Sequence, residues 1–128
     1  MMIKFNSFFP VIWTENFEET IGFYIHILKF ALVDANSEMQ WAFLQKDSVK
    51  MMITKPNEHE NFDKIGFSGS FYFNVNDVND LWQDLKTITK ICYKIENFEW
   101  GMREFAIYDN NGYILQFGQP TAEISKEE

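Results

Sequence analysis

The sequence predicts an α+β fold in which two similar βαβββ modules form a curved mixed sheet around a cleft. A strand-like run, a helix and three more strand-like runs occur in that order in residues 7–54 and again in residues 70–120. A polar connector, residues 55–69, separates the modules, and a polar tail follows at residues 121–128. We therefore expect residues 1–120 to form a single domain made of two modules.

The two modules match each other in their first halves. When residues 11–24 are laid over residues 72–85, Asn16 falls on Asp77, so that strand, helix cap and helix coincide. Internal duplication is the simplest explanation. Two such modules side by side would curve their sheets around a common cleft, and concave, largely apolar places of this kind are where ligand sites usually lie.

The first module opens with residues 7–14, whose aromatic and β-branched side chains predict a strand buried on both faces. Pro10 cannot donate a hydrogen bond and favours a sheet edge or a bulge. A helix follows, with Asn16 as its predicted cap and Glu19 reaching back to it. Apolar residues recur at helical spacing as far as Leu28, where we expect the helix to end. Three short strands are then expected at residues 30–34, 39–44 and 49–54.

The second module repeats this order. Residues 71–75 predict a strand, Asp77 a helix cap, and an apolar stripe a helix that ends near Thr87. Three further strands are expected at residues 91–95, 103–108 and 113–117. The turn Asp109-Asn110-Asn111-Gly112 between the last two predicts a hairpin, because Asn and Gly adopt positive φ at low energy.

The composition is ordinary for a globular protein, with one exception. Hydrophobic residues make up 46% and charged residues 23%, but 18% of the residues are aromatic. This surplus indicates either a ring-lined cavity or interface, or simply a bulky core. The net charge of -8 repels nucleic acids and anionic lipids, so we expect neither as a partner, and cationic or neutral organic ligands fit better.

Cysteine usage and hydropathy point to the cytoplasm. The single cysteine, Cys92, cannot form an internal disulfide, and no run approaches the roughly 20 apolar residues of a membrane span. The first residues also lack the pattern of a signal peptide. Cys92 alternates with apolar neighbours, which indicates a buried structural thiol rather than a nucleophile.

Three segments together carry a family resemblance. FPVIWTENFEETIGFYIHILKF forms a strand and a helix with the pair Phe23-Tyr24, and Lys29 stands where a glycine is usual. FYFNVNDVNDLWQDL repeats the strand and helix, and WGMREFAIYDNNGYILQFGQP forms the closing hairpin. These segments span residues 7–120 and resemble the vicinal oxygen chelate superfamily of glyoxalases, bleomycin-resistance proteins and extradiol dioxygenases. The resemblance implies the fold, while one scaffold of this kind hosts many functions.

Metal-dependent members of that superfamily hold a divalent ion with four side chains, typically His, Gln or Glu. The resemblance places these positions at Phe9, at Met51 or Met52, at Ser70 and at Gln116, and only Gln116 is a plausible ligand. We therefore expect no metal and no other cofactor. The nearest functional analogue is then the bleomycin-resistance type, which the resemblance describes as a homodimer that sequesters a bulky cationic drug.

Candidate ligand contacts in the first module are aromatic. Strand alternation and the resemblance place Phe9 and Trp13 on the cleft side of the first strand. Trp13 is either a contact at the rim of the cleft or a core ring under the first helix. Trp41 and Phe43 share one face of the third strand, and that face is either cleft or core.

Candidate contacts in the second module are mostly polar. Tyr72 and Asn74 alternate on the matching face and could orient a ligand, or Asn74 could hydrogen-bond within the sheet. Arg103 could grip a carboxylate or phosphate, or form an ion pair with Glu104. The full predicted ligand-binding set is Phe9, Trp13, Trp41, Phe43, Tyr72, Asn74, Trp100, Arg103 and Gln116.

The sequence thus predicts metal-independent binding or sequestration of a small, partly aromatic or cationic ligand, and it assigns no catalytic residue. A homodimer is expected because two open sheets leave edges and apolar faces to cover. Two alternatives remain open. The first is a metal-dependent lyase or dioxygenase of the same superfamily, and the second is a non-catalytic interaction subunit.

Overall fold

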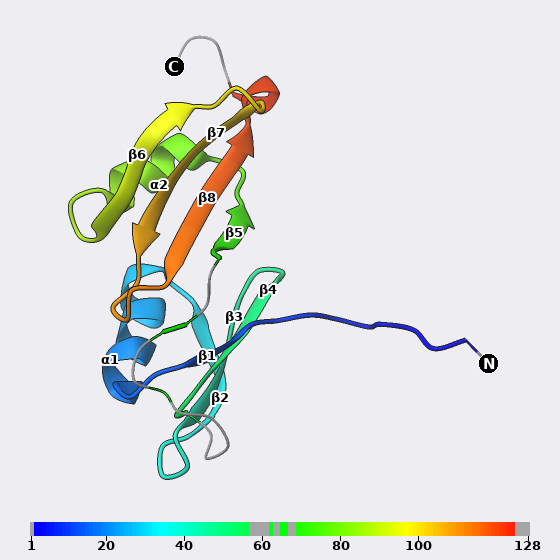
Figure 1. Ribbon diagram of the computed structural model, residues 1–128, viewed down its shortest axis with the longest axis vertical. Coiled ribbons are helices and arrows are strands. Elements are labelled where there is room, and N and C mark those ends of the chain that lie inside the picture. Colours follow the sequence, from blue (N-terminus) through cyan, green and yellow to red (C-terminus); the bar gives the residue numbers. More distant parts are fainter. Residues whose placement is uncertain (1, 57–61, 63–64, 67–68, 125–128) are drawn as a thin grey trace. The chain divides into compact units, whose positions relative to one another are not determined.

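A computed structural model describes residues 2–56, 62, 65–66 and 69–124 of the chain. The chain divides into two compact units, residues 1–63 and residues 64–128. Each unit contains one four-stranded mixed sheet and one main helix (Figure 1), which confirms the predicted α+β class. The predicted connector lies partly outside the described residues. No helix in the described part of the chain is long and apolar enough to cross a membrane.

The first unit follows the predicted order of strand, helix and three strands. Its elements are β1 (Val11–Trp13), α1 (Phe17–Gly22), the π-helical turn η1 (Phe23–Ile27), β2 (Ala31–Asn36), β3 (Trp41–Lys46) and β4 (Val49–Thr54). In space the strand order is β1-β4-β3-β2. β1 runs parallel to β4, and the other neighbours are antiparallel.

The second unit repeats this arrangement. Its elements are β5 (Phe71–Asn74), α2 (Val78–Leu85), β6 (Lys90–Asn97), β7 (Met102–Tyr108), β8 (Ile114–Pro120) and the short 3₁₀ helix η2 (Thr121–Glu123). The strand order is β5-β8-β7-β6, again with the first and last strands parallel. The predicted hairpin closes where the Gly112 amide donates to the Asp109 carbonyl at 3.2 Å, and Gly112 has φ 99°. The two sheets share one topology, as internal duplication predicts.

The first strand is shorter and more exposed than the sequence suggested. The prediction that residues 7–14 are buried on both faces is wrong, because Phe8 is exposed while Ile12 is buried. The Pro10 carbonyl still accepts a hydrogen bond from the Met52 amide at 3.0 Å. Pro10 has no proton to donate, so regular pairing of the first strand begins only after it.

The first helix begins after Asn16 as predicted, but the predicted side-chain cap is wrong. No side-chain hydrogen bond caps α1. Instead, the Thr14 hydroxyl accepts from the Asn16 amide at 2.9 Å, and the Thr20 hydroxyl donates to the Asn16 carbonyl at 2.8 Å. The π-helical turn η1 continues α1 as far as Ile27 and has Leu28 as its C-cap, so the helical segment ends near Leu28 as expected. Lys29 follows with φ 66°, in the left-handed region that favours glycine.

The second helix has the predicted cap. The Asp77 carboxylate accepts from the Asp80 amide at 3.1 Å. The helix ends at Leu85, before the predicted end near Thr87, and the Thr89 hydroxyl donates to the Leu85 carbonyl at 2.8 Å.

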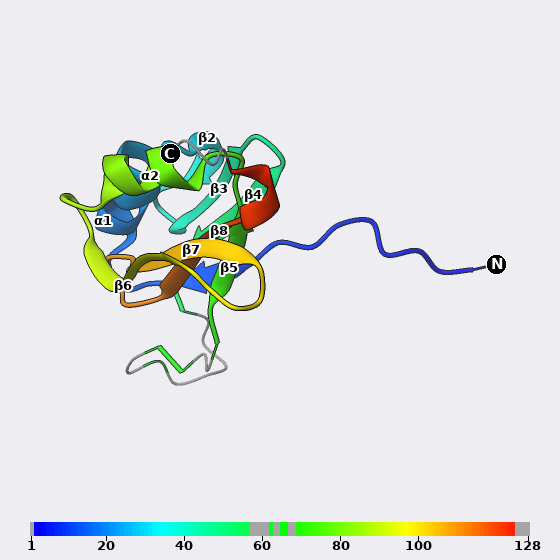
Figure 2. The same cartoon turned by 90° about the horizontal axis from the view of Figure 1, so that it is seen from above.

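In each unit the helix covers one face of the sheet, and the core lies between them (Figure 2). The central core residues of the first unit are Ile12, Tyr24, Leu44, Met51 and Ile53. Those of the second unit are Leu85, Phe105, Ile107, Leu115 and Phe117. Alternate strand residues point away from the helix. We call the face that carries them the open face of each sheet.

Candidate functional site

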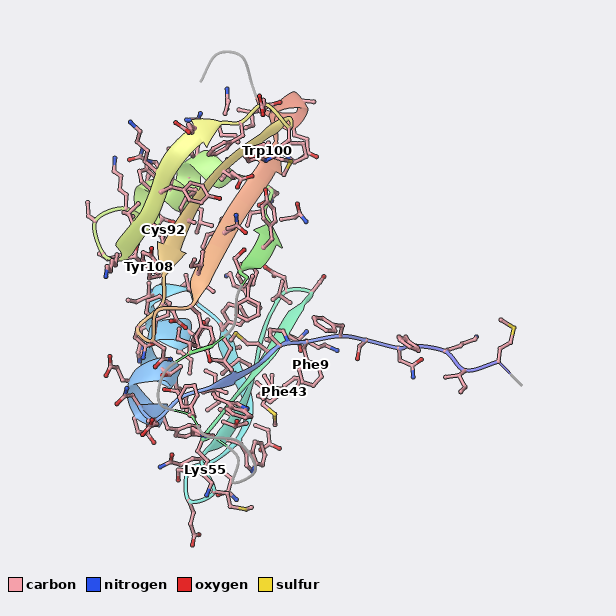
Figure 3. The ribbon with its side chains drawn as sticks, viewed as in Figure 1. Phe9, Phe43, Lys55, Cys92, Trp100 and Tyr108 are labelled. Carbon is pink, nitrogen blue, oxygen red and sulfur yellow. The ribbon has the colours of Figure 1, made fainter. Side chains whose placement is uncertain are left out.

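The open face of the first sheet is lined by rings. Two rows of residues cross it from β1 through β4 to β3, namely Val11-Met52-Phe43 and Trp13-Thr54-Trp41. Phe9 packs edge to face on Phe43, with ring centroids 5.2 Å apart (Figure 3). Trp13 contacts Phe62 in the same way at 5.9 Å. Because Ile12 takes the buried position beside α1, Trp13 is not a core ring under that helix.

The open face of the second sheet carries a buried carboxylate. Glu104 in β7 is 1% exposed. Its Oε1 atom accepts hydrogen bonds from Tyr72 Oη and from Trp100 Nε1, each at 2.9 Å, and its Oε2 atom accepts one from Tyr93 Oη. The donors come from β5, from β6 and from the turn before β7. Three donors supply the partners that a buried negative charge requires.

A chain of hydrogen bonds extends from this carboxylate to β8. The Gln116 amide nitrogen donates to Tyr93 Oη at 2.8 Å, and the Ser70 hydroxyl donates to the Gln116 amide oxygen. Tyr93 therefore accepts from Gln116 and donates to Glu104. We name Ser70, Tyr72, Tyr93, Trp100, Glu104 and Gln116 the Glu104 cluster.

Gly118 in β8 makes room for Tyr72. In the sheet register Gly118 lies between Asn74 and Glu104. A Cβ atom at Gly118 would lie 1.9 Å from Tyr72 Oη and 2.7 Å from the ring carbon that bears it. The Tyr72 side chain therefore reaches Glu104 across bare backbone, and a side chain at position 118 would block it.

Both tyrosines of the cluster keep their protons near neutral pH. Burial, followed by the hydrogen bond to Glu104 and the charge of that carboxylate, together raise the pKa of Tyr72 from 10.0 to about 12. Burial also raises the pKa of Tyr93, again with help from Glu104 and against a smaller lowering by Gln116. Neither phenol is therefore a base near pH 7.

The hydroxyl protons of the cluster point inward, which leaves hydrogen-bond acceptors at the surface. Tyr72 is 41% exposed and directs its proton at Glu104, so the lone pairs on its oxygen remain as acceptors. Exposed Ser70 directs its proton at Gln116 in the same way. A ligand at this surface meets hydrogen-bond acceptors above a buried carboxylate, which favours ligands that donate protons or carry positive charge.

A stacked pair of rings borders the cluster. The Phe98 and Trp100 rings are 4.6 Å apart at an interplanar angle of 13°, and Trp100 is exposed (Figure 3). Gly101 has φ 85°, and its amide donates to the Phe98 carbonyl at 3.1 Å, which forms the tight turn that holds the pair. Since the Trp100 nitrogen donates to Glu104, the indole is fixed while its ring remains available for stacking.

Arg103 lies outside the cluster. Neighbouring residues of a strand point to opposite faces, so Arg103 points to the helix side and Glu104 to the open face. Arg103 Nε donates to Asn79 of α2 at 2.7 Å, and Nη1 donates to Asn97 at 3.2 Å. Arg103 therefore binds two amide side chains and does not form the ion pair with Glu104 that the sequence suggested. Asn74, by contrast, is exposed on β5 beside the cluster.

The positions implied for metal ligands do not fit a metal ion. Register places Met52 on the open face, in a row with Phe43, while Met51 is buried in the core. Phe9 and Met52 offer a ring and a thioether, and both ends of the Gln116 amide are hydrogen-bonded. A hard divalent ion is poorly served by such donors. Within the described residues, no group of three or more His, Cys, Asp or Glu side chains could hold a metal ion.

The sequence pattern identified Tyr72, Trp100 and Gln116, which the structure brings together, but it missed Glu104, Tyr93 and Gly118 as parts of the site. Two signals were available. A charged residue inside an otherwise apolar strand must find partners if it is buried. A glycine inside a strand often marks a place where another group approaches the backbone closely.

Two βαβββ units with open sheet faces define the class of this protein, a paired-module α+β fold. A family model described as the Glyoxalase/Bleomycin resistance protein/Dioxygenase superfamily matches residues 5–117. The chain belongs to this superfamily, as its sequence resemblance implied. No protein with a curated function matches it in sequence.

Solved structures share the fold at low sequence identity. A superfamily member from Sphaerobacter thermophilus DSM 20745 gives a TM-score of 0.76 at 17% identity, covering 90% of this chain and 98% of that chain. A protein of unknown function from Agrobacterium tumefaciens str. C58 gives 0.74 at 16%, covering 92% and 96%. TioX from Micromonospora sp. ML1 gives 0.71 at 15%, covering 90% and 99%. At these identities the likeness establishes the fold alone.

Proposed function

We propose that this protein binds a small organic cation with a flat ring, without a metal, on the open face of the second sheet. The observation that carries the proposal is the Glu104 cluster, in which a buried carboxylate draws the protons of its neighbours inward. A ligand ammonium or guanidinium group would donate to the oxygens of Tyr72 and Ser70. The ligand's ring would stack on Trp100.

The charge of the whole chain supports the same class of ligand. A net charge of -8 attracts cations and speeds their encounter with the protein. The negative field of the protein would repel an anionic ligand, and so would the acceptor oxygens that the cluster presents at its surface. We therefore propose that the site selects against carboxylates and phosphates.

Binding or sequestration fits the cluster better than catalysis. The raised pKa values of Tyr72 and Tyr93 keep both phenols protonated, and three donors enclose the Glu104 carboxylate. The cluster thus offers no group placed to take a proton from a ligand near pH 7. The matching family description includes bleomycin-resistance proteins, which is consistent with a binding role.

The open face of the first sheet, taken by itself, is a candidate aromatic contact surface. Phe9, Trp13, Trp41 and Phe43 present partly exposed rings there. Aromatic faces attract flat heterocycles and cations alike. We propose that these rings bind flat or cationic molecules on the first unit, independently of the Glu104 cluster.

Three probes of one shape test the proposal directly. 2-Naphthylmethylammonium, 2-naphthylmethanol and 2-naphthoate carry the same ring with a positive, neutral and negative group. We expect the cation to bind about tenfold more tightly than the alcohol, and the carboxylate to bind most weakly. Isothermal titration calorimetry measures all three, and quenching of tryptophan fluorescence checks the result.

Two isosteric variants control the experiment. Glu104→Gln should remove most of the preference for the cation, because the buried charge is lost. Glu96→Gln, which neutralises an exposed carboxylate opposite Glu104 on β6, should keep it. Equal affinities for the three probes, or the tightest binding by naphthoate, would exclude a cation site. A stoichiometric divalent metal in protein purified without chelator would exclude metal-independent binding.

A further inference from the structure

Asn74, on the open face of the second sheet, carries a polar side chain that the fold does not use. It is exposed on β5, although asparagine is depleted in strands. Its carboxamide makes no hydrogen bond within the part of the chain that the structure describes, whereas the Asn97 carboxamide accepts from Arg103 at 3.2 Å. An unused carboxamide offers both an acceptor oxygen and a donor nitrogen to a ligand.

The sheet register places this carboxamide in line with the proposed ligand contacts. Asn74, Gly118 and Glu104 form one row across β5, β8 and β7. The Tyr72 oxygen lies over Gly118, between the other two residues of the row. Trp100 belongs to the turn between β6 and β7, the two strands farthest from β5 in the sheet. The face therefore presents a carboxamide, then a phenol oxygen, then an indole ring.

The spacing of these groups matches an α-amino amide with an aromatic side chain. Neighbouring strands lie about 4.8 Å apart, so roughly one strand spacing separates Asn74 from the phenol oxygen over β8. In an α-amino amide, one carbon carries the ammonium group, the amide and the arm that leads to the ring. The ammonium group would donate to Tyr72, and the ring would stack on Trp100. The amide would pair with the carboxamide of Asn74, donor to acceptor on both sides.

We propose that the ligand is the amino terminus of a peptide that begins with an aromatic residue. This inference rests on the proposed function, because the ammonium group and the ring use the contacts assigned there. Within the second sheet β5 has a neighbour on one side only, so a peptide that passes Asn74 can continue beyond the sheet edge. A free amino acid fits poorly, because its carboxylate would lie near buried Glu104 in a chain of net charge -8.

Four ligands that share one ring test the inference by isothermal titration calorimetry. They are 2-(2-naphthyl)ethylammonium, L-2-naphthylalanine amide, L-2-naphthylalanine and the dipeptide L-2-naphthylalanyl-glycine amide. The amide should bind about tenfold more tightly than the simple amine, because it gains hydrogen bonds to Asn74. The dipeptide should bind at least as tightly as the amide. The free amino acid should bind at least about tenfold more weakly than the amide.

The variant Asn74→Leu isolates the carboxamide. Leucine has a shape close to that of asparagine but no hydrogen-bonding atoms in its side chain. The advantage of the amide over the amine should therefore shrink to less than about twofold, while the affinity for the amine stays within about twofold. Gln83→Leu removes an exposed carboxamide from α2 and should preserve the full advantage. Circular dichroism confirms that both variants are folded.

Two patterns of affinity distinguish a failure of the proposed function from a failure at Asn74. If the amine binds no more tightly than 2-(2-naphthyl)ethanol, the cation site is wrong, and the peptide terminus fails with it. If the amine is preferred but the amide adds nothing, or if Asn74→Leu keeps the advantage, the cation site stands and the role of Asn74 is overturned. A dipeptide that binds about tenfold more weakly than the amide would overturn the peptide terminus, and so would tighter binding by the free amino acid.

Discussion

In the first sheet, one row across the open face reads Trp13-Thr54-Trp41, and the corresponding row in the second sheet reads Asn74-Gly118-Glu104. The neighbouring row changes from Val11-Met52-Phe43 to Tyr72-Gln116-Ala106. The backbone pairing is the same in both sheets. One surface is made of rings and a thioether, and the other of a buried carboxylate with its hydrogen-bond donors.

This contrast shows that the polar surface depends on linked changes. Glu104 holds the position in its row that Trp41 holds in the first sheet. A buried carboxylate there is stable only if hydrogen-bond donors reach it. Tyr72 supplies one of them, and it does so because position 118 has no side chain. A threonine there, as at Thr54 in the first sheet, would keep the phenol away. The residues that distinguish the two faces should therefore show strong energetic coupling.

Removing the carboxylate should have the largest effect. Glu104→Ala leaves the donors of Tyr72, Tyr93 and Trp100 without their acceptor and opens a cavity. We expect the free energy of unfolding to fall by about 3 kcal/mol, measured by urea denaturation. Glu96→Ala, which removes an exposed carboxylate, should change it by less than about 0.5 kcal/mol. Equal losses in the two variants would mean that the cluster does not stabilise the second unit.

Filling the gap under Tyr72 should have the next largest effect. Gly118→Thr copies Thr54 and should lower the free energy of unfolding by about 2 kcal/mol, since Tyr72 must leave Glu104. In a Tyr72→Val background, which copies Val11, the same change should cost about 1 kcal/mol less. A double-mutant cycle by chemical denaturation measures this coupling.

The second unit offers a control for that cycle. A Cβ atom at Gly66 would meet nothing within 4 Å. Gly66→Ala should therefore change stability by less than about 0.5 kcal/mol. Purely additive costs in the cycle would show that Gly118 and Tyr72 act separately, and the comparison of the two sheets would lose its explanation.

Alkaline pH should weaken the second unit through Tyr72. Its pKa rises from 10.0 to about 12 in the folded chain, so the folded state favours the protonated phenol. This stabilisation is complete below pH about 10 and is lost as the pH rises to about 12. Denaturation curves between pH about 8 and 11 should show the decline, and Tyr72→Phe should make it shallower. An unchanged slope in the variant would contradict the assignment to Tyr72.

The fold was predictable because its signals are local. Alternation, helical spacing and turn residues such as Gly112 lie within a few residues of the elements that they define. The errors occurred where particular contacts, rather than residue type and spacing, decide the structure. Phe8 lies in a run with the composition of a buried strand, but it is exposed because regular pairing begins only after Pro10. Asn16 could cap its helix, but Thr14 and Thr20 bind its backbone instead.

The site was predictable only in part for the same reason. Alternation placed Tyr72 and Asn74 on one face without any knowledge of their partners. Glu104 receives two of its three hydrogen bonds from residues 32 and 11 positions away, Tyr72 and Tyr93, and no local pattern marks those pairs. Gln116 was predicted as a ligand contact and as the one plausible donor among the implied metal positions, and in the structure its amide links Tyr93 to Ser70.

The smallest effect is expected on the opposite face of β7. Arg103→Gln loses part of the contact with Asn79 and Asn97, so the free energy of unfolding should fall by about 1 kcal/mol or less. Affinity for 2-naphthylmethylammonium should stay within about twofold, whereas Trp100→Ala should lower it about tenfold because the stacking ring is lost. If Arg103→Gln instead abolished binding of 2-naphthoate, Arg103 would be an anion contact. The second unit would then have a separate anion-binding site on the helix side of its sheet.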